Sequence, residues 1–186
     1  MNKQADNPRL AIFMANGCEE IEGLTVVDLV RRAGIPIDMV SVHMESKVTG
    51  SHGIAFETDV TAASTDWSSY TGVVLPGGMP GTNRLKEDGT VDRIVREYAG
   101  SGKLVAAICA SPTVLAECGV LNGKNATCYP GLELPGANAK TDPVVRDGNI
   151  LTSRGVGTAI PFALAIVEYF QGKESAKELA EKIVFS

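Results

Sequence analysis

Short apolar runs alternate along the chain with segments whose apolar residues recur every three or four positions. The run at residues 104–108 is apolar throughout, which is typical of a strand buried on both faces of a sheet. Residues 90–99 instead place apolar side chains at i, i+3, i+4 and i+7, on one side of a helix. We therefore predict strands at 9–15, 37–42, 72–75, 104–108 and 149–153, and helices at 20–33, 90–99, 112–118, 160–170 and 175–184.

This alternation predicts an α/β fold: a flavodoxin-like three-layer sandwich with a mostly parallel sheet and helices on both faces. The dinucleotide-binding G-x-G-x-x-G pattern does not follow the first strand. Around residues 54–56 we expect a small antiparallel edge hairpin. We expect residues 1–8 to form a disordered or loosely ordered lead and residues 9–186 to form a single domain.

Composition narrows the range of partners. The formal net charge is −5 and the Lys and Arg residues do not cluster, so we expect no binding of nucleic acid. The start of the chain is polar and no apolar run approaches about 18 residues, so we expect a cytoplasmic protein without a membrane span. The four cysteines form no CxxC pair and no zinc-type spacing, which favours reduced thiols.

The predicted parallel sheet places Cys109 at the end where ligands usually bind. Ligands bind beyond the carboxyl ends of parallel strands, where residues 16–22, 76–81, 109–113 and 153–158 should meet. Cys109 ends a buried strand and Pro112 begins a helix, a strand-turn-helix similar to a nucleophile elbow. The helix terminus should lower the pKa of the Cys109 thiol. The alternative is a small buried core cysteine. Cys18, at the same end of the sheet, is a candidate partner thiol.

Two further features converge on the same end. Gly77 and Gly78 stop a strand, where their N–H groups can approach a bound oxygen closely, although a simple tight turn is the alternative. Glu22 lies in the first turn of a predicted helix and is expected to face inward, beside the cysteine turn. A carboxyl group among apolar neighbours and a thiolate would have a raised pKa and could donate a proton.

Five motifs at their mutual spacing make the chain resemble the ThiJ/PfpI superfamily, in the branch of the Parkinsonism-associated protein deglycase and its bacterial relatives. They lie at residues 17–22, 28–34, 74–78, 106–112 and 151–158, and the resemblance runs from about Arg9 to Val184. It implies a homodimer in which Cys109 is the reactive cysteine and oxidises to a stable sulfinic acid. It also implies that Glu22 is a protonated acid bonded to the sulfur, and that Gly77, Gly78 and Ala110 supply backbone donors around it.

The chain departs from that branch at two positions. Tyr129 stands where the Parkinsonism-associated protein has a histidine, and His52 stands where it has an arginine. Arg32 and Arg154 match family positions, and with Tyr129 and His52 they are the candidate substrate contacts. No histidine follows Cys109 in the sequence, so protease and glutaminase activities, which need one there, are disfavoured.

Two functional hypotheses remain at this stage. In the first, the protein is a cysteine-dependent glyoxalase or deglycase that needs no metal or organic cofactor and acts on small carbonyl substrates under oxidative or carbonyl stress. In the second, it is a non-enzymatic redox sensor or chaperone that uses an oxidisable Cys109. Both use the same thiol, so the sequence leaves the choice open.

Overall fold

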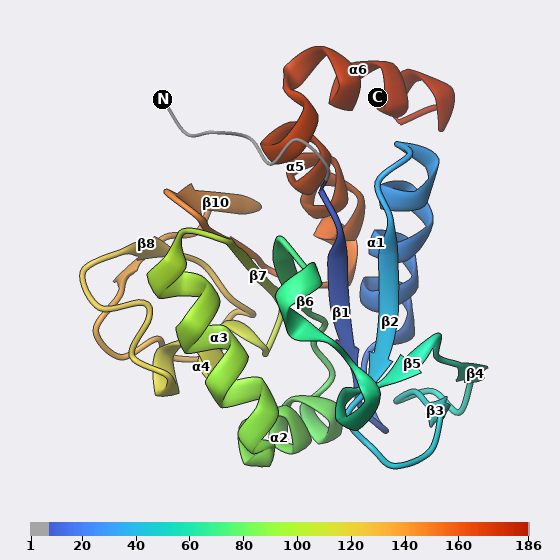
Figure 1. Cartoon of the computed structure of the whole chain (residues 1–186). Helices are drawn as coiled ribbons and strands as arrows, with labels where there is room; N and C mark the ends of the chain where they lie inside the picture. Colours follow the sequence, from blue (N-terminus) through green and yellow to red (C-terminus); the bar gives the residue numbers. More distant parts are fainter. Residues whose placement is uncertain (1–7, 186) are drawn as a thin grey trace.

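A seven-stranded sheet forms the centre of the molecule (Figure 1). The structure is a computed structural model and describes residues 8–185. The strand order is β10-β11-β7-β6-β1-β2-β5, and every neighbouring pair is parallel except β10 with β11. The strands are β1 (Leu10–Met14), β2 (Ile37–Ser41), β5 (Val60–Thr61), β6 (Gly72–Leu75), β7 (Leu104–Ile108), β10 (Val144–Asp147) and β11 (Ile150–Ser153).

Alternate residues of each central strand supply two separate cores. In β1, Leu10 and Ile12 pack on the side that also carries α1, α5 and α6, whereas Phe13 packs on the opposite side, which carries α2, α3 and α4. This two-sided burial explains why the central strands are apolar throughout. The predicted flavodoxin-like α/β sandwich is confirmed. The helices are α1 (Glu20–Arg32), α2 (Met79–Glu87), α3 (Gly89–Ser101), α4 (Pro112–Glu117), α5 (Ala159–Gln171) and α6 (Lys173–Lys182).

Short strands form one edge of the central sheet and two small separate sheets. The expected hairpin is present as β3 (Lys47–Thr49) paired antiparallel with β4 (Ala55–Glu57). The apolar pattern did not predict β10, the antiparallel partner of β11, or the small parallel pair β8 (Asn125–Ala126) and β9 (Asn138–Ala139). The first seven residues of the expected N-terminal lead lie outside the described part of the chain.

Helix α2 was not predicted, because Pro80 and Gly81 in its first turn are typical of a loop. Pro80 is tolerated there, since the first residues of a helix need no N–H partner. Gly81 is required by packing: a Cβ at this position would lie 2.6 Å from the backbone nitrogen of Cys18. The glycine therefore lets α2 approach the loop that follows β1.

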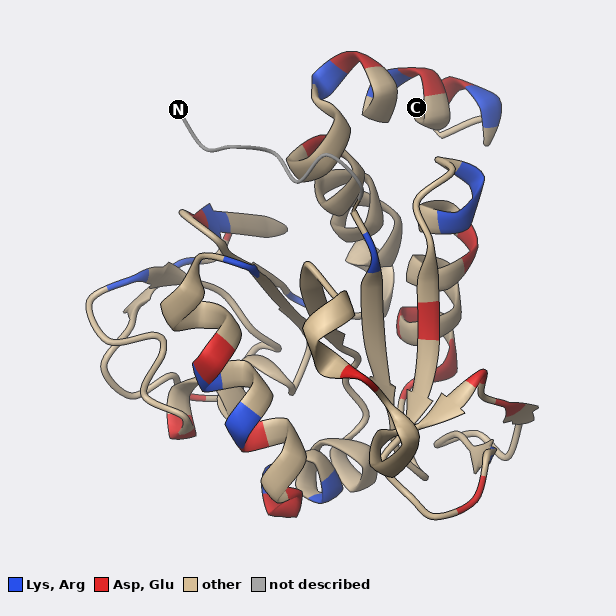
Figure 2. Cartoon of the chain, in the orientation of Figure 1, with Lys and Arg blue, Asp and Glu red and all other residues tan. Residues whose placement is uncertain are grey.

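Helix α1 delivers its N-terminus to the carboxyl end of the sheet. Glu20 and Glu22 lie in its first turn, and Arg31 and Arg32 in its last, so its charges complement the helix dipole (Figure 2). The Glu19 side chain caps the helix by accepting the N–H of Ile21. Across the described residues, no helix combines the length and apolarity that a membrane crossing requires.

Candidate active site

Cys109 occupies a sharp turn directly after β7. Its φ is 65°, a left-handed conformation that residues other than glycine adopt rarely and at a cost. Hydrogen bonds on both sides hold it: the Cys109 N–H donates to the carbonyl of Ser153 at 3.0 Å, and its carbonyl accepts the N–H of Tyr129 at 2.8 Å. Helix α4 begins three residues later. This is the strand-turn-helix arrangement that the sequence predicted.

Glu22 lies against this turn. Its side chain is fully buried, and Oε2 accepts the N–H of Gly77 at 2.8 Å, whereas Oε1 has no hydrogen-bond partner that meets the usual geometry among the described residues. A Cβ added to Gly77 would lie 2.6 Å from both Glu22 Oε2 and Cys109 Cβ, and 3.1 Å from Cys109 Sγ. Gly77 is thus the spacer that allows the carboxyl and thiol groups to be neighbours.

The environment of Glu22 suits proton exchange near neutral pH. Burial raises its pKa to about 7, against the opposing effects of hydrogen bonding with the Cys109 side chain and with the Gly77 N–H. A carboxyl group with this pKa is populated both as an acid and as a base at pH 7, which is what proton shuttling requires.

The pKa of the Cys109 thiol is raised, not lowered as the sequence analysis predicted. Burial raises it to about 12, the negative charge of Glu22 adds to this, and the N–H groups of Gly78 and Ala110 act in the opposite direction. Burial and the carboxylate therefore outweigh the terminus of the short helix α4. Once Glu22 is protonated its charge no longer opposes the thiolate, and the acid can donate a hydrogen bond to the sulfur.

Low pKa does not distinguish Cys109 from the other thiols. Burial also raises the pKa values of Cys18 and Cys118 to about 12, and that of Cys128 by a smaller amount. Burial therefore acts in the same direction on all four thiols. What sets Cys109 apart is its position, because it alone of the four lines the cavity described below.

The expected backbone donors divide between two acceptors. The N–H groups of Gly78 and Ala110 face the Cys109 sulfur and lower the pKa of its thiol. The N–H of Gly77 is instead bonded to Glu22, so it is not free for a substrate oxygen. The reason is the close approach of the Glu22 carboxyl group, which the spacing of residues in the sequence does not reveal.

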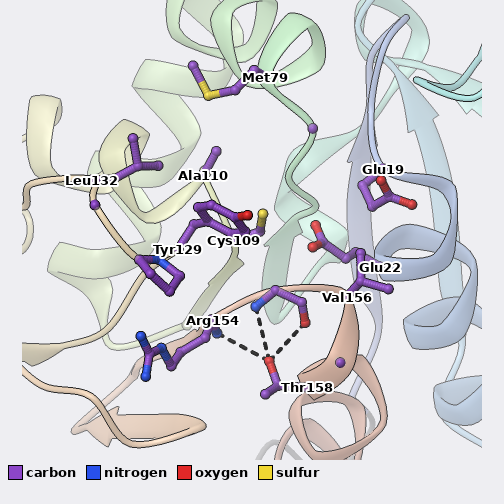
Figure 3. A pocket seen from close by; sticks show the side chains of 15 residues that line it. Glu19, Glu22, Met79, Cys109, Ala110, Tyr129, Leu132, Arg154, Val156 and Thr158 are labelled. Carbon is purple, nitrogen blue, oxygen red and sulfur yellow. Dashed lines mark hydrogen bonds between the residues drawn. The ribbon is translucent and has the colours of Figure 1, made fainter.

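A cavity of about 920 Å³ opens above these groups (Figure 3). Cys109, Glu22, Tyr129 and Arg154 all line it. Gly155 lies between two of them: a Cβ at this position would be 3.5 Å from Cδ2 of Tyr129 and 4.0 Å from Oε1 of Glu22. Gly155, in the loop that follows β11, therefore leaves room for both the Tyr129 ring and the Glu22 carboxyl group in the cavity wall.

Three other candidate residues do not line this cavity. His52 Nδ1 lies 3.0 Å from Glu20 Oε2, and its backbone N–H donates to the same carboxyl group. Arg32 forms an exposed ion pair with Asp28 one turn earlier in α1. Cys18 is almost completely buried beneath α2. The structure therefore groups Cys109, Glu22, Tyr129 and Arg154 in one site and leaves His52, Arg32 and Cys18 outside its wall.

Side chains around His52 bring three potential metal ligands together, from Glu19, Glu20 and His52. Their candidate ligand atoms lie within 4.8 Å of one another. Hydrogen bonds from His52 and Ser51 already occupy the Glu20 carboxyl group, so this cluster is internally satisfied.

Part of the cavity wall was not predicted from the sequence. Met79, Leu132 and Val156 contribute apolar surface, and Thr158 organises the loop below them. Thr158 Oγ1 accepts the N–H groups of Arg154 at 3.2 Å and Gly155 at 3.1 Å (Figure 3). The threonine after Gly155-Val156-Gly157 was a signal for such a turn, but the apolar residues lie in loops and at a helix start where no periodicity marks them.

Gly77→Ala should disrupt the site. The new methyl group would overlap the side chains of Glu22 and Cys109, and we expect a loss of about 1–3 kcal/mol in the free energy of unfolding from overpacking. We also expect the rate of Cys109 alkylation by iodoacetamide to change at least about threefold. Gly89→Ala is the matched control, because a Cβ there meets no atom within 4 Å. Equal stability and reactivity in both variants would contradict this account of Gly77.

Comparison with known proteins gives one matching family, the DJ-1/PfpI family, over residues 8–169. Protein dj-1beta of Drosophila melanogaster is 38% identical over 177 residues, which cover 93% of this chain and 95% of that protein. The crystal structure of Drosophila DJ-1beta matches with a TM-score of 0.93 and covers 97% of this chain and 99% of that chain.

Two further relatives carry information about chemistry. The glutathione-independent glyoxalase DJR-1.2 of Caenorhabditis elegans is 30% identical over 183 residues, which cover 96% of this chain and 97% of that protein. The structure of oxidized DJ-1 from Toxoplasma gondii is 31% identical, with a TM-score of 0.90, and covers 96% of this chain and 99% of that chain.

Proposed function

Because the chain belongs to the DJ-1/PfpI family, we propose that it is a glutathione-independent glyoxalase whose nucleophile is Cys109. The observation that carries this proposal is the buried Glu22 carboxyl group, with a pKa of about 7, beside a thiol that lines a cavity. The glyoxalase DJR-1.2 supports the same activity. The substrates are small 2-oxoaldehydes. In a hemiaminal adduct of such a compound, the bond from the sulfur would replace the carbon–nitrogen bond, and the amine would leave with the thiol proton, which gives the same hemithioacetal.

The high pKa of the thiol requires a base, and Glu22 supplies it. As the sulfur attacks the aldehyde carbon, the Glu22 carboxylate accepts the thiol proton. The N–H groups of Gly78 and Ala110, which face the sulfur, are in position to stabilise the developing oxyanion. Glu22 then returns the proton to that oxygen, which gives a hemithioacetal and restores the carboxylate.

The same carboxylate carries out the second proton transfer. It removes the hydrogen of the former aldehyde carbon and delivers it to the adjacent ketone carbon, while the hydroxyl proton passes to the ketone oxygen. The product is a 2-hydroxy thioester on Cys109. Water cleaves the thioester, releases a 2-hydroxy acid and restores the thiol. The sum is one dicarbonyl plus one water, with no net oxidation and no metal or organic cofactor.

The direct test is turnover of methylglyoxal by the purified protein without glutathione. We expect lactate to accumulate in proportion to the methylglyoxal consumed. Consumption without lactate would indicate simple adduct formation with side chains and would exclude the proposed reaction.

Oxidation of Cys109 supports a second candidate function, that of a redox sensor. A relative, DJ-1 of Toxoplasma gondii, is known in an oxidized form. In this chain a protonated Glu22 lies where it can donate a hydrogen bond to an oxidised sulfur. Each peroxide molecule would transfer one oxygen atom to the sulfur and leave as water, giving first the sulfenic and then the sulfinic acid.

Mild peroxide treatment should therefore add two oxygen atoms at Cys109 and then stall. Intact-mass and peptide mass spectrometry will show whether the sulfinic acid accumulates. Glu22→Gln, which cannot donate through a carboxylic acid, should shift the product toward the sulfonic acid or the sulfenic acid. An identical product distribution in both proteins would remove Glu22 from this role.

We also propose that the chain forms a homodimer through the outer face of α1. A groove of about 600 Å³ runs beside Ile21 and Ile54, both more than half exposed, and Ile160 and Ile183 line its floor. A second copy of the chain would bury this apolar surface.

Ile54→Glu should shift the mass measured by light scattering from two chains to one. The control Met44→Glu changes an exposed side chain that does not line the groove. A dimer that survives Ile54→Glu would argue against this face.

A further inference from the structure

The cavity at Cys109 is much larger than a three-carbon dicarbonyl requires. Its volume of about 920 Å³ lies near the top of the range of roughly 300–1,000 Å³ that holds drug-sized ligands. Methylglyoxal has only a methyl group beyond its two carbonyl groups. Bound at Cys109, it would leave most of the cavity filled with water.

The cavity wall carries apolar side chains. Met79 and Val156 line the cavity, although their side chains are 51% and 44% exposed, and Leu132 adds a partly buried isobutyl group. Exposed apolar side chains gathered around a cavity indicate a surface that binds an apolar group. The titratable groups in the wall of this cavity are Glu19, Glu22, Cys109, Tyr129 and Arg154.

The chemistry fixes which part of the substrate faces the apolar wall. The aldehyde carbon must meet the sulfur of Cys109, and its hydrogen must face Glu22. In Figure 3, Leu132 lies across Cys109 and Tyr129 from Glu19 and Glu22, and Met79 lies at the top of the view, above Cys109. Glu22 must reach both reacting carbons, so the substituent on the ketone carbon is the part of the substrate left to occupy the rest of the cavity, whose apolar wall includes Met79 and Leu132.

We propose that this cavity selects 2-oxoaldehydes with a branched apolar substituent over methylglyoxal, and that Met79 and Leu132 determine this specificity. The proposal rests on the glyoxalase function above and names its substrate class. Each methylene that is fully buried favours binding by roughly fourfold. An isobutyl group adds three carbons to the methyl group of methylglyoxal, so its full burial is worth up to roughly sixtyfold.

The test compares methylglyoxal with 4-methyl-2-oxopentanal, which share the same reacting groups. We expect kcat/KM for the branched substrate to exceed that for methylglyoxal by at least tenfold. Met79→Ala and Leu132→Ala should each reduce this ratio by about three- to tenfold. Met44→Ala is the matched control, because Met44 is an exposed methionine that does not line the cavity, and it should leave the ratio unchanged.

A second readout does not depend on turnover. We expect N-cyclohexylmaleimide to alkylate Cys109 at least tenfold faster than N-methylmaleimide at low reagent concentration, and Met79→Ala and Leu132→Ala to reduce that preference. If neither dicarbonyl is turned over, the glyoxalase function fails, and the maleimide ratio still decides whether the cavity prefers apolar groups. If methylglyoxal is turned over at least as well as the branched substrate, or if both wall variants keep the wild-type ratios, the inferred specificity is wrong.

Discussion

Cys109→Ser should reduce glyoxalase turnover by roughly a thousandfold or more, since loss of a catalytic nucleophile commonly has effects of this size. Serine preserves the size of the side chain, so the turn and the Glu22 contact should remain. A hydroxyl group is a far weaker acid than a thiol, and the Glu22 carboxylate cannot generate the alkoxide that attack on the aldehyde would need. Steady-state production of lactate from methylglyoxal, measured on matched protein concentrations, gives the effect directly.

The other cysteines provide the controls. Cys118 and Cys128 do not line the cavity, so Cys118→Ser and Cys128→Ser should retain turnover within about twofold. Thermal unfolding of each variant will verify that the fold is intact. If Cys109→Ser keeps more than a tenth of the wild-type rate, the reaction does not pass through a bond to this sulfur.

Glu22→Gln should have the second largest effect, a loss of turnover of about a hundredfold to ten-thousandfold. Glutamine keeps the shape of the side chain but cannot accept the thiol proton or move the carbon-bound proton. Tyr129→Phe is the informative partner, because it removes one hydroxyl group near the same site. Loss of one hydrogen bond to substrate predicts a decrease of about tenfold or less. If Tyr129→Phe is as inactive as Glu22→Gln, the phenol takes part in the proton relay.

Glu22→Gln should also stabilise the protein at alkaline pH. The pKa of Glu22 rises from an ordinary value of 4.5 to about 7 on folding, so the folded state holds this proton more tightly than the unfolded state. Below pH 4.5 the group is protonated in both states, and its ionisation costs nothing. Stability then falls as the pH rises toward 7, and above that value the buried charge costs about 3 kcal/mol.

Glu22→Gln removes this penalty, so the free energy of unfolding of the variant should increase relative to that of the wild type as the pH rises. Urea unfolding at pH 5 and pH 8.5 measures the difference in the free energy of unfolding at each pH. We expect the difference to grow by about 2–3 kcal/mol in favour of glutamine between the two values. A constant difference would mean that Glu22 is not a buried, destabilised carboxylate.

The sequence predicted the parts of the fold that depend on burial from both sides. The run at 104–108 is apolar at every position because helices cover both faces of β7. This pattern can be recognised in the sequence even when the neighbouring strands and helices are not known. Strands β8, β9 and β10 are short, and many of their residues are exposed, so they carry no such pattern. Helix α2 was hidden by Pro80 and Gly81, whose presence reflects local packing against the Cys18 loop.

The candidate site was predictable to the extent that it depends on topology. Cys109 and Glu22 both follow strands at the carboxyl edge of the sheet, so strand order alone brings them together. The direction of the Cys109 pKa shift depends on how deeply the thiol is buried and on the charge of the adjacent Glu22 carboxyl group. Both depend on the folded structure and cannot be predicted from the sequence pattern. The contact of His52 with Glu20 could not be predicted for a similar reason, since the loop after β3 brings the two residues together only in the folded chain.

The left-handed backbone of Cys109 has a consequence for the evolution of this protein. Glycine would adopt a φ of 65° without strain, so Cys109→Gly relieves the turn while it removes the nucleophile. Stability and activity therefore pull in opposite directions at this one position. In a lineage that no longer needs the chemistry, drift toward glycine would carry little penalty. In a descendant that keeps cysteine at this position, we expect that selection still acts on the thiol.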